Sequence, residues 1–182
     1  MPAHAQVTCT GHELLEKARP DTSCFDVKPV SHPSPDGSLR ASVLGVDASL
    51  YATPDMESRV VIRTADGTTR TSRDFSSPRG ANGYYVVNAE WSPDSKFFVF
   101  SLSSSGGHSP WSFPIWVYGF KRNFFASATS MIGDRPTVSP DFTFTAPHTL
   151  AAKTWRQSGS PEDQVTVTVD LDAAFDKPPP PN

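Results

Sequence analysis

The chain has 182 residues, of which 37% are hydrophobic and 19% are charged, and its formal net charge is −3. No apolar run approaches the ~20 residues that span a membrane. The lysines and arginines are dispersed, so nucleic acid is not an expected partner either. The 18 prolines and 11 glycines favour turns over long helices. Because the apolar clusters are short and rich in Phe, Val, Tyr and Trp, the composition predicts one mostly β domain.

Residues 1–29 are predicted to form an N-terminal segment that contains one short helix. The sequence TGHELLEKARP begins with a capping box and ends at a proline, which are start and stop signals of a helix. This helix would lie between the two cysteines of the chain, Cys9 and Cys24. A disulfide between them would close a loop of about fifteen residues and stabilise the fold by roughly 3 kcal/mol. Two separate reduced thiols are the alternative.

The first residues also carry a signal of export. The tripeptide Ala3-His4-Ala5 resembles the small-residue end of a secretory signal peptide whose charged and apolar parts are missing. A disulfide would agree with this interpretation, because disulfides persist in oxidising compartments such as the bacterial periplasm. We therefore expect a periplasmic or secreted protein, and an ordinary cytosolic start is the alternative.

The tripeptide Ser-Pro-Asp occurs three times, at residues 34–36, 92–94 and 139–141. Proline fixes φ and the aspartate can bond the backbone beyond it, so each copy is expected to start a tight turn. The copies are 58 and 47 residues apart, which is within or near the length of one β-propeller blade. The aspartates are predicted to be structural turn residues: Asp36, Asp94 and Asp141.

Four consecutive antiparallel strands are predicted around the central copy, at residues 83–90, 96–102, 115–118 and 123–128. Four strands in about 45 residues are typical of a propeller blade. The first copy is followed by three predicted strands, at residues 39–46, 59–64 and 68–72. After the third copy, residues 164–171 alternate strictly, with Val165, Val167, Val169 and Leu171 on one half-buried face. No fourth strand is evident for this third unit.

The central unit resembles the proline–aspartate repeat of TolB-like β-propellers. That repeat has an apolar strand, then W-S-P-D-G-K, a strand ending in F-x-S, a Gly-containing loop and an I-[WY]-V strand. The corresponding residues here are 91–96 (WSPDSK), 99–101 (VFS), 106–107 (GG) and 115–117 (IWV). The sequence departs from the pattern at Ser95, where the repeat usually has glycine. The resemblance covers roughly residues 30–171 and is most specific over residues 83–129.

The resemblance implies an all-β fold, an antiparallel meander of about three propeller-blade-like repeats within residues 30–176. Closed propellers have about four to eight blades, and three sheets alone would leave strand edges exposed. A homodimer could complete a six-bladed ring, and a β-sandwich or one long curved meander is the alternative. The tail, residues 177–182, is proline-rich and is predicted to be extended and disordered.

No pattern in the sequence predicts a catalytic residue, a metal site or a cofactor. The five histidines do not pair at metal-ligand spacing, and HELLE has Glu16 where the second histidine of a zinc-protease motif must be. There is no nucleophile elbow and no glycine-rich phosphate loop. Catalytic carboxylate pairs can meet only in the fold, so the question of catalysis stays open, with a non-enzymatic protein favoured.

One loop is a candidate binding site because it places large rings between glycines and prolines. His108, Trp111 and Phe113 lie in this loop, and exposed aromatic rings often mark binding surfaces. The alternative is that the rings fold back over the sheet and complete the core. Trp91 and Trp116, at strand edges of the repeat, are expected to be core residues.

The sequence favours an exported, non-enzymatic module that binds a protein or an envelope component, as the resemblance implies for a scaffold fold. A small-ligand-binding protein or a hydrolase acting on envelope carbohydrate is the first alternative, and it would require a pocket with converging acidic or histidine side chains. The second alternative is a structural subunit that pairs through an exposed strand, for which residues 165–171 are the candidate.

Overall fold

The computed structural model describes six segments, residues 29–45, 57–77, 82–106, 112–133, 135–155 and 163–176. Within these segments the chain forms eleven strands in three antiparallel sheets, with two short helices. The predicted N-terminal helix, Cys9, Cys24 and the proline-rich tail lie outside the described residues.

In each sheet every strand pairs with its neighbour in the sequence. The first sheet contains β1 (Val30–Pro33), β2 (Leu39–Gly45), β3 (Ser58–Thr64) and β4 (Thr69–Asp74). The second contains β5 (Tyr84–Trp91), β6 (Phe97–Ser104), β7 (Ile115–Gly119) and β8 (Phe124–Ser127). The third contains β9 (Thr137–Ala146), β10 (Thr149–Trp155) and β11 (Gln164–Asp170). Helix α2 (Ala128–Met131) leads from the second sheet to the third, and α3 (Leu171–Asp176) follows β11.

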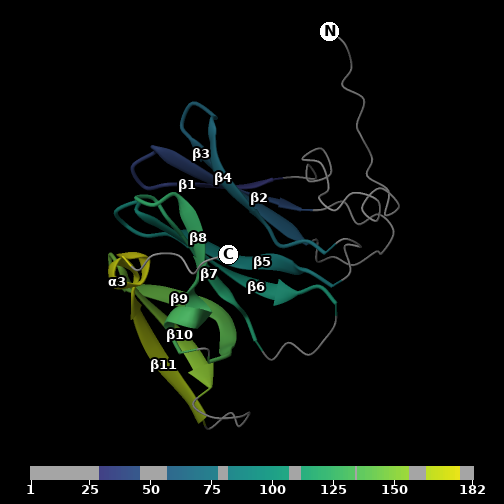
Figure 1. The fold of residues 1–182 in the computed structure, drawn as a ribbon, viewed down its shortest axis with the longest axis vertical. Helices are drawn as coiled ribbons and strands as arrows, with labels where there is room; N and C mark the ends of the chain where they lie inside the picture. The colour runs from purple at the N-terminus through teal and green to yellow at the C-terminus, as the bar shows by residue number, and fades with distance from the viewer. Residues whose placement is uncertain are drawn as a thin grey trace.

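The three sheets follow one another in space as they do in the sequence, with the second sheet between the other two (Figure 1). The all-β meander of three blade-like units predicted from the sequence is therefore confirmed. Each predicted strand of the first two sheets is present to within a few residues, and the third sheet has three strands.

The position of strand β6 explains why the sequence FFVF, residues 97–100, is continuously apolar. Phe98 and Phe100 point to a cluster shared with the first sheet, whereas Phe97 and Val99 point to a cluster shared with the third sheet. All four side chains are at most 4% exposed. A strand that is buried on both faces needs an unbroken apolar run, whereas a strand with one solvated face alternates.

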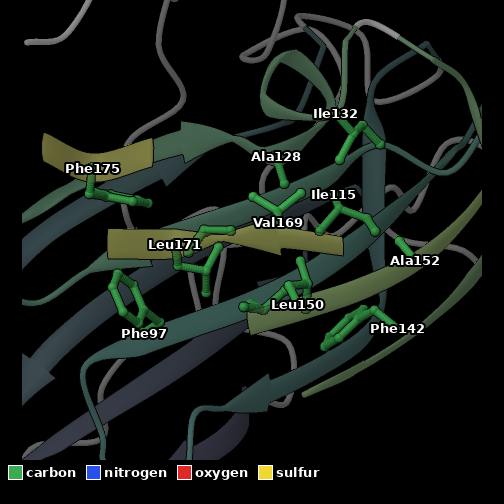
Figure 2. Close-up of a cluster of buried hydrophobic side chains, with 12 residues drawn as sticks. Phe97, Ile115, Ala128, Ile132, Phe142, Leu150, Ala152, Val169, Leu171 and Phe175 are labelled. Atoms are coloured by element: carbon green, nitrogen blue, oxygen red, sulfur yellow. The ribbon is translucent and has the colours of Figure 1, made fainter. Parts of the chain in front are cut away.

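The cluster between the second and third sheets is closed by helix α3. Figure 2 shows Phe97 and Ile115 of the second sheet with Leu150 of the third sheet, and Leu171 and Phe175 of α3 beside them. Strand β11 contributes one alternating face, on which the side chains of Val165 and Val167 are half-buried and that of Val169 is buried. The half-buried face predicted for this strand is confirmed.

The cluster between the first and second sheets contains the other face of the second sheet. Trp91 is 5% exposed, and its indole N–H donates to the carbonyl of His32 in β1 at 2.9 Å. This hydrogen bond ties β5 to the first sheet, so Trp91 is a core residue as predicted. Trp116 is half-buried, and the Arg73 guanidinium lies 3.8 Å from the centre of its indole ring.

A buried carboxylate joins the first two sheets at the end opposite the Ser-Pro-Asp turns. Glu57 is 1% exposed and precedes β3. It accepts hydrogen bonds from the backbone N–H groups of Ser77 and Gly83 and from the hydroxyl of Ser105. A Cβ atom on Gly83 would lie 2.6 Å from the Glu57 carboxylate, so only glycine fits there. Connections within the first two sheets and the segment between these sheets therefore meet on one side chain.

The structure differs from the prediction at the third Ser-Pro-Asp. Asp141 lies within β9, and the turn from β9 to β10 is formed by Pro147 and His148. Phe142 pairs with Ala152 and Thr137 pairs with Thr154. Between these two pairs the chain advances five residues along β9 but only two along β10, so β9 carries extra residues here. Residues 139–141 therefore form an irregularity inside a strand, because the apolar partners of β10 come after them in the sequence.

The outward face of the third sheet is polar. Its exposed side chains include Thr143, Lys153, Thr166 and Thr168. This face offers hydroxyl groups and a charge to solvent, unlike the apolar faces of the second sheet. A six-bladed ring of two chains would need apolar surface on this outward face, since propeller blades bury their faces against each other.

Candidate functional site

Three strand turns converge at one end of the sheets, and we call this end the turn face. The turns are residues 34–38 between β1 and β2, residues 92–96 between β5 and β6, and residues 147–148 between β9 and β10. In the first two turns the serine hydroxyl donates to the aspartate two residues later, Ser34 to Asp36 at 2.7 Å and Ser92 to Asp94 at 2.8 Å. These hydrogen bonds fix the turns within themselves.

Ser95 links the first turn to the second. Its φ is 66°, in the left-handed region that favours glycine, and the equivalent residue of the first turn is Gly37 with φ 72°. The side chain of Ser95 is buried, and its hydroxyl accepts a hydrogen bond from the backbone N–H of Asp36 at 3.0 Å. The departure from the TolB-like pattern therefore exchanges an unstrained glycine for a hydrogen bond between sheets.

His148 links the second turn to the third turn and to α3. Its Nε2 lies 2.5 Å from Asp94 Oδ2, and its Nδ1 contacts Asp172 Oδ2. The hydrogen bond to Asp94 raises the pKa of His148 against the effect of burial, and Asp172 adds to the rise. Both ring nitrogens contact carboxylates, and this arrangement favours the protonated form of the imidazole as a bridge between them.

The carboxylates of the turn face are held in their charged form. Burial would raise the pKa of Asp94, but hydrogen bonds from His148, Lys96 and Ser92 outweigh burial and hold that pKa below its ordinary value. Hydrogen bonds from the Ser34 hydroxyl and the Ser38 backbone lower the pKa of Asp36 to about 2. Both aspartates are therefore ionised at neutral pH.

These turns surround a cavity of about 880 Å³, which also reaches the β7–β8 turn and α3. The cations that line it are Arg70, Lys96, Lys121 and Arg122. The carboxylates that line it are Asp36, Asp94 and Asp172. Four cations against three carboxylates leave one positive charge, and protonation of His148 leaves two. The lining is therefore positive although the chain carries −3.

Aromatic rings form the apolar part of the cavity. The turn between β7 and β8 contains Phe120 and also positions the Arg70 side chain. Asn123 accepts hydrogen bonds from the Tyr118 hydroxyl at 3.0 Å and from the Arg70 Nε at 3.3 Å. The Arg70 guanidinium lies 4.8 Å from the centre of the Phe120 ring, which is 40% exposed. The cavity therefore combines cations with an accessible ring.

The predicted binding loop does not form this cavity in the part of the chain that is described. His108 and Trp111 lie outside the described residues. Phe113 is half-buried, its N–H donates to the Thr137 carbonyl at 3.0 Å, and the Thr137 hydroxyl donates back to its carbonyl. Phe113 is thus tied to β9 and is not among the residues that line the cavity.

The described segments contain no group of three or more His, Cys, Asp or Glu side chains that could hold a metal ion. They also contain no helix long and apolar enough to cross a membrane.

No family model and no curated protein matches the chain. Among solved structures, a Bacteroides ovatus protein described as a dipeptidyl aminopeptidase IV is similar, with a TM-score of 0.49 and 14% identity. The β-propeller domain of the trilobed protease from Pyrococcus furiosus has a TM-score of 0.42 and 13% identity. Each match covers 80% of this chain, but only 23% of the first structure and 40% of the second. At these values the likeness carries no information about function.

The hydrogen bond of the Ser95 hydroxyl and the backbone strain at Ser95 should have similar and opposite effects on stability. Ser95→Ala loses the hydrogen bond to Asp36 and keeps the left-handed φ, so we expect a loss of about 1 kcal/mol in the free energy of unfolding. Ser95→Gly loses the same bond but relieves roughly 1 kcal/mol of backbone strain, which should bring it near the wild type. Urea denaturation measures both. An alanine variant as stable as the glycine variant would contradict this account.

The His148 bridge should make stability depend on pH. Because its folded-state pKa is raised, the stabilisation by His148 is complete below the unfolded value of ~6.5 and is lost as pH rises through the folded value. Asp94 has a lowered pKa, so its contribution is present above ~3.9 and is lost as pH falls. The difference in unfolding free energy between wild type and His148→Gln should therefore be largest near about pH 6 and shrink towards about pH 9. Urea denaturation across this range checks it, and a constant difference would refute the bridge.

Proposed function

We propose that the chain is a non-enzymatic protein-interaction module of the TolB-like type, which binds its partner at the turn face. The motif that carries this resemblance, residues 91–96, joins β5 to β6 in a complete four-stranded sheet. The same motif supplies Asp94, Ser95 and Lys96 to the lining of the cavity. The repeat that forms the second sheet thus also contributes to the binding surface.

The observation that carries the proposal is the composition of the cavity. Its volume of about 880 Å³ is within the size range of ligand sites, which combine apolar walls with a few placed polar groups. The groups that could perform acid–base chemistry are already engaged, since His148 bridges two carboxylates and Asp36 is bound within its own turn. An arrangement of this kind favours recognition over turnover.

Export belongs to the same proposal. Periplasmic or extracellular binding domains commonly contain disulfides, which Cys9 and Cys24 could form. An envelope component would then be a suitable partner. This part of the proposal rests on the sequence alone.

A second candidate function, a structural subunit, is favoured by the third sheet. That sheet has three strands, and β11 pairs only with β10 among the described strands. Val165 and Val167 on β11 are half-exposed, and residues 164–170 contain no lysine or proline of the kind that blocks edge pairing. A strand from a second copy could therefore extend this sheet.

Phe120 should be needed for binding at the turn face. We expect peptides selected from a random display library to bind the wild type and to lose about fivefold or more in affinity with Phe120→Ser, because an accessible ring is a typical anchor. Tyr84→Ser is the matched control. Tyr84 is 39% exposed, and it lies at the start of β5, which is the end of the strand away from the turn face. If every selected peptide binds both variants equally well, or none is selected, the proposed function fails.

The structural candidate predicts a dimer through β11. Light scattering across a dilution series measures the solution mass, and a dimer that Val167→Lys dissociates would favour this candidate. The lysine would place a charge on the apolar face of an edge strand, whereas Thr168→Lys on the polar face should leave the dimer intact. A monomer at all concentrations would remove pairing between copies from consideration.

A further inference from the structure

We propose that the cavity of the turn face binds a carboxylate presented by an acidic side chain of an extended peptide segment, next to a large apolar residue. This inference rests on the proposed function and names the chemistry of the partner. It follows from a comparison of the cavity's carboxylates, which have partners within the chain, with its lysines, which keep donors for a ligand.

The carboxylates of the cavity have hydrogen-bond partners within the chain. Asp94 contacts His148 and lies 3.0 Å from the Lys96 ammonium. Asp172 contacts the other nitrogen of His148, and the Asp36 carboxylate is bound by hydroxyl and backbone donors of its own turn. Asp94 and Asp36 therefore offer little attraction to a cationic ligand, because their hydrogen-bonding capacity is largely used, whereas the side chain of Asp172 is 57% exposed.

Two lysines of the cavity keep donors for a ligand. Lys121 is exposed, and no hydrogen bond or ion pair joins it to another residue that the structure describes. The Lys96 ammonium pairs with Asp94, but it has three N–H donors and its side chain is 57% exposed at the same cavity, so donors remain for a ligand. Two ammonium groups at the rim can thus donate to an incoming carboxylate, and such charge-assisted hydrogen bonds are stronger than neutral ones.

The neighbouring ring explains why the acidic residue should have an apolar neighbour. Phe120 precedes Lys121 in the β7–β8 turn, and the Arg70 guanidinium fixes its position from one side. Phe97 and Phe175 lie deeper in the lining, with their ring centres 5.5 Å apart. A peptide that places its carboxylate at Lys121 can therefore bury an adjacent apolar side chain against aromatic surface.

The charge of the whole chain selects against a polyanion. A net charge of −3 repels nucleic acid at long range, whereas the cavity carries one or two positive charges locally. Nucleic-acid sites need an extended basic stripe. One carboxylate on a peptide matches the local charge without requiring such a stripe.

The probe for this inference is the fluorescein-labelled peptide Gly-Ser-Phe-Glu-Phe-Ser-Gly with an amidated C-terminus, followed by fluorescence anisotropy. We expect binding that weakens between about 50 mM and about 300 mM salt, because screening reduces charge pairing. Lys121→Gln should weaken it about threefold to tenfold. Lys153→Gln, which removes another exposed lysine from the outward face of the third sheet, should leave it unchanged.

Two further peptides decide between the outcomes. The same peptide with Gln in place of Glu should bind at least about threefold more weakly. If the Gln peptide regains affinity when its C-terminus is left as the free acid, carboxylate recognition stands and the source is a chain end. If the Glu and Gln amides bind equally and Phe120→Ser weakens both, the carboxylate inference is overturned while the proposed function survives. If no peptide binds and the library yields none, both are overturned.

Discussion

The structure depends on one sheet that is buried on both faces. Strand β6 sends Phe98 and Phe100 to the first sheet and Phe97 and Val99 to the third. The two outer sheets are therefore oriented by the same strand, and their turns are brought to the same end. The cavity at the turn face is a consequence of this packing, since its lining comes from elements up to 139 residues apart, from Asp36 to Phe175.

Contacts between neighbouring turns make three local structures into one surface. The Ser95 hydroxyl joins the first turn to the second, and His148 joins the second to the third and to α3. The first contact uses a serine at the position that glycine occupies in the first turn. His148 and Asp94 are largely engaged with each other, which leaves Lys121 and the remaining donors of Lys96 at the rim to determine what the surface attracts.

Much of the fold could be predicted because strong local patterns carry it. The apolar run of β6 and the alternation of β11 identify strands by themselves. Strand β10 has the sequence TLAAKTW, whose two alanines and lysine weaken both patterns, and β1 has only four residues. The cavity could not be predicted, because Pro147-His148 lacks the Ser-Pro-Asp signature. The contact of His148 with Asp94 also spans 54 residues and depends on the register of β9 with β10.

The two hydrophobic clusters lie on opposite faces of the second sheet, and this distributes stability unevenly along the chain. Opening of the third sheet exposes one cluster and leaves the other closed, so it can occur as a local event. Opening of the second sheet exposes both clusters at once, which amounts to global unfolding. The second sheet therefore makes unfolding cooperative. The third sheet and α3, where His148 completes the cavity, can open without loss of the remaining fold.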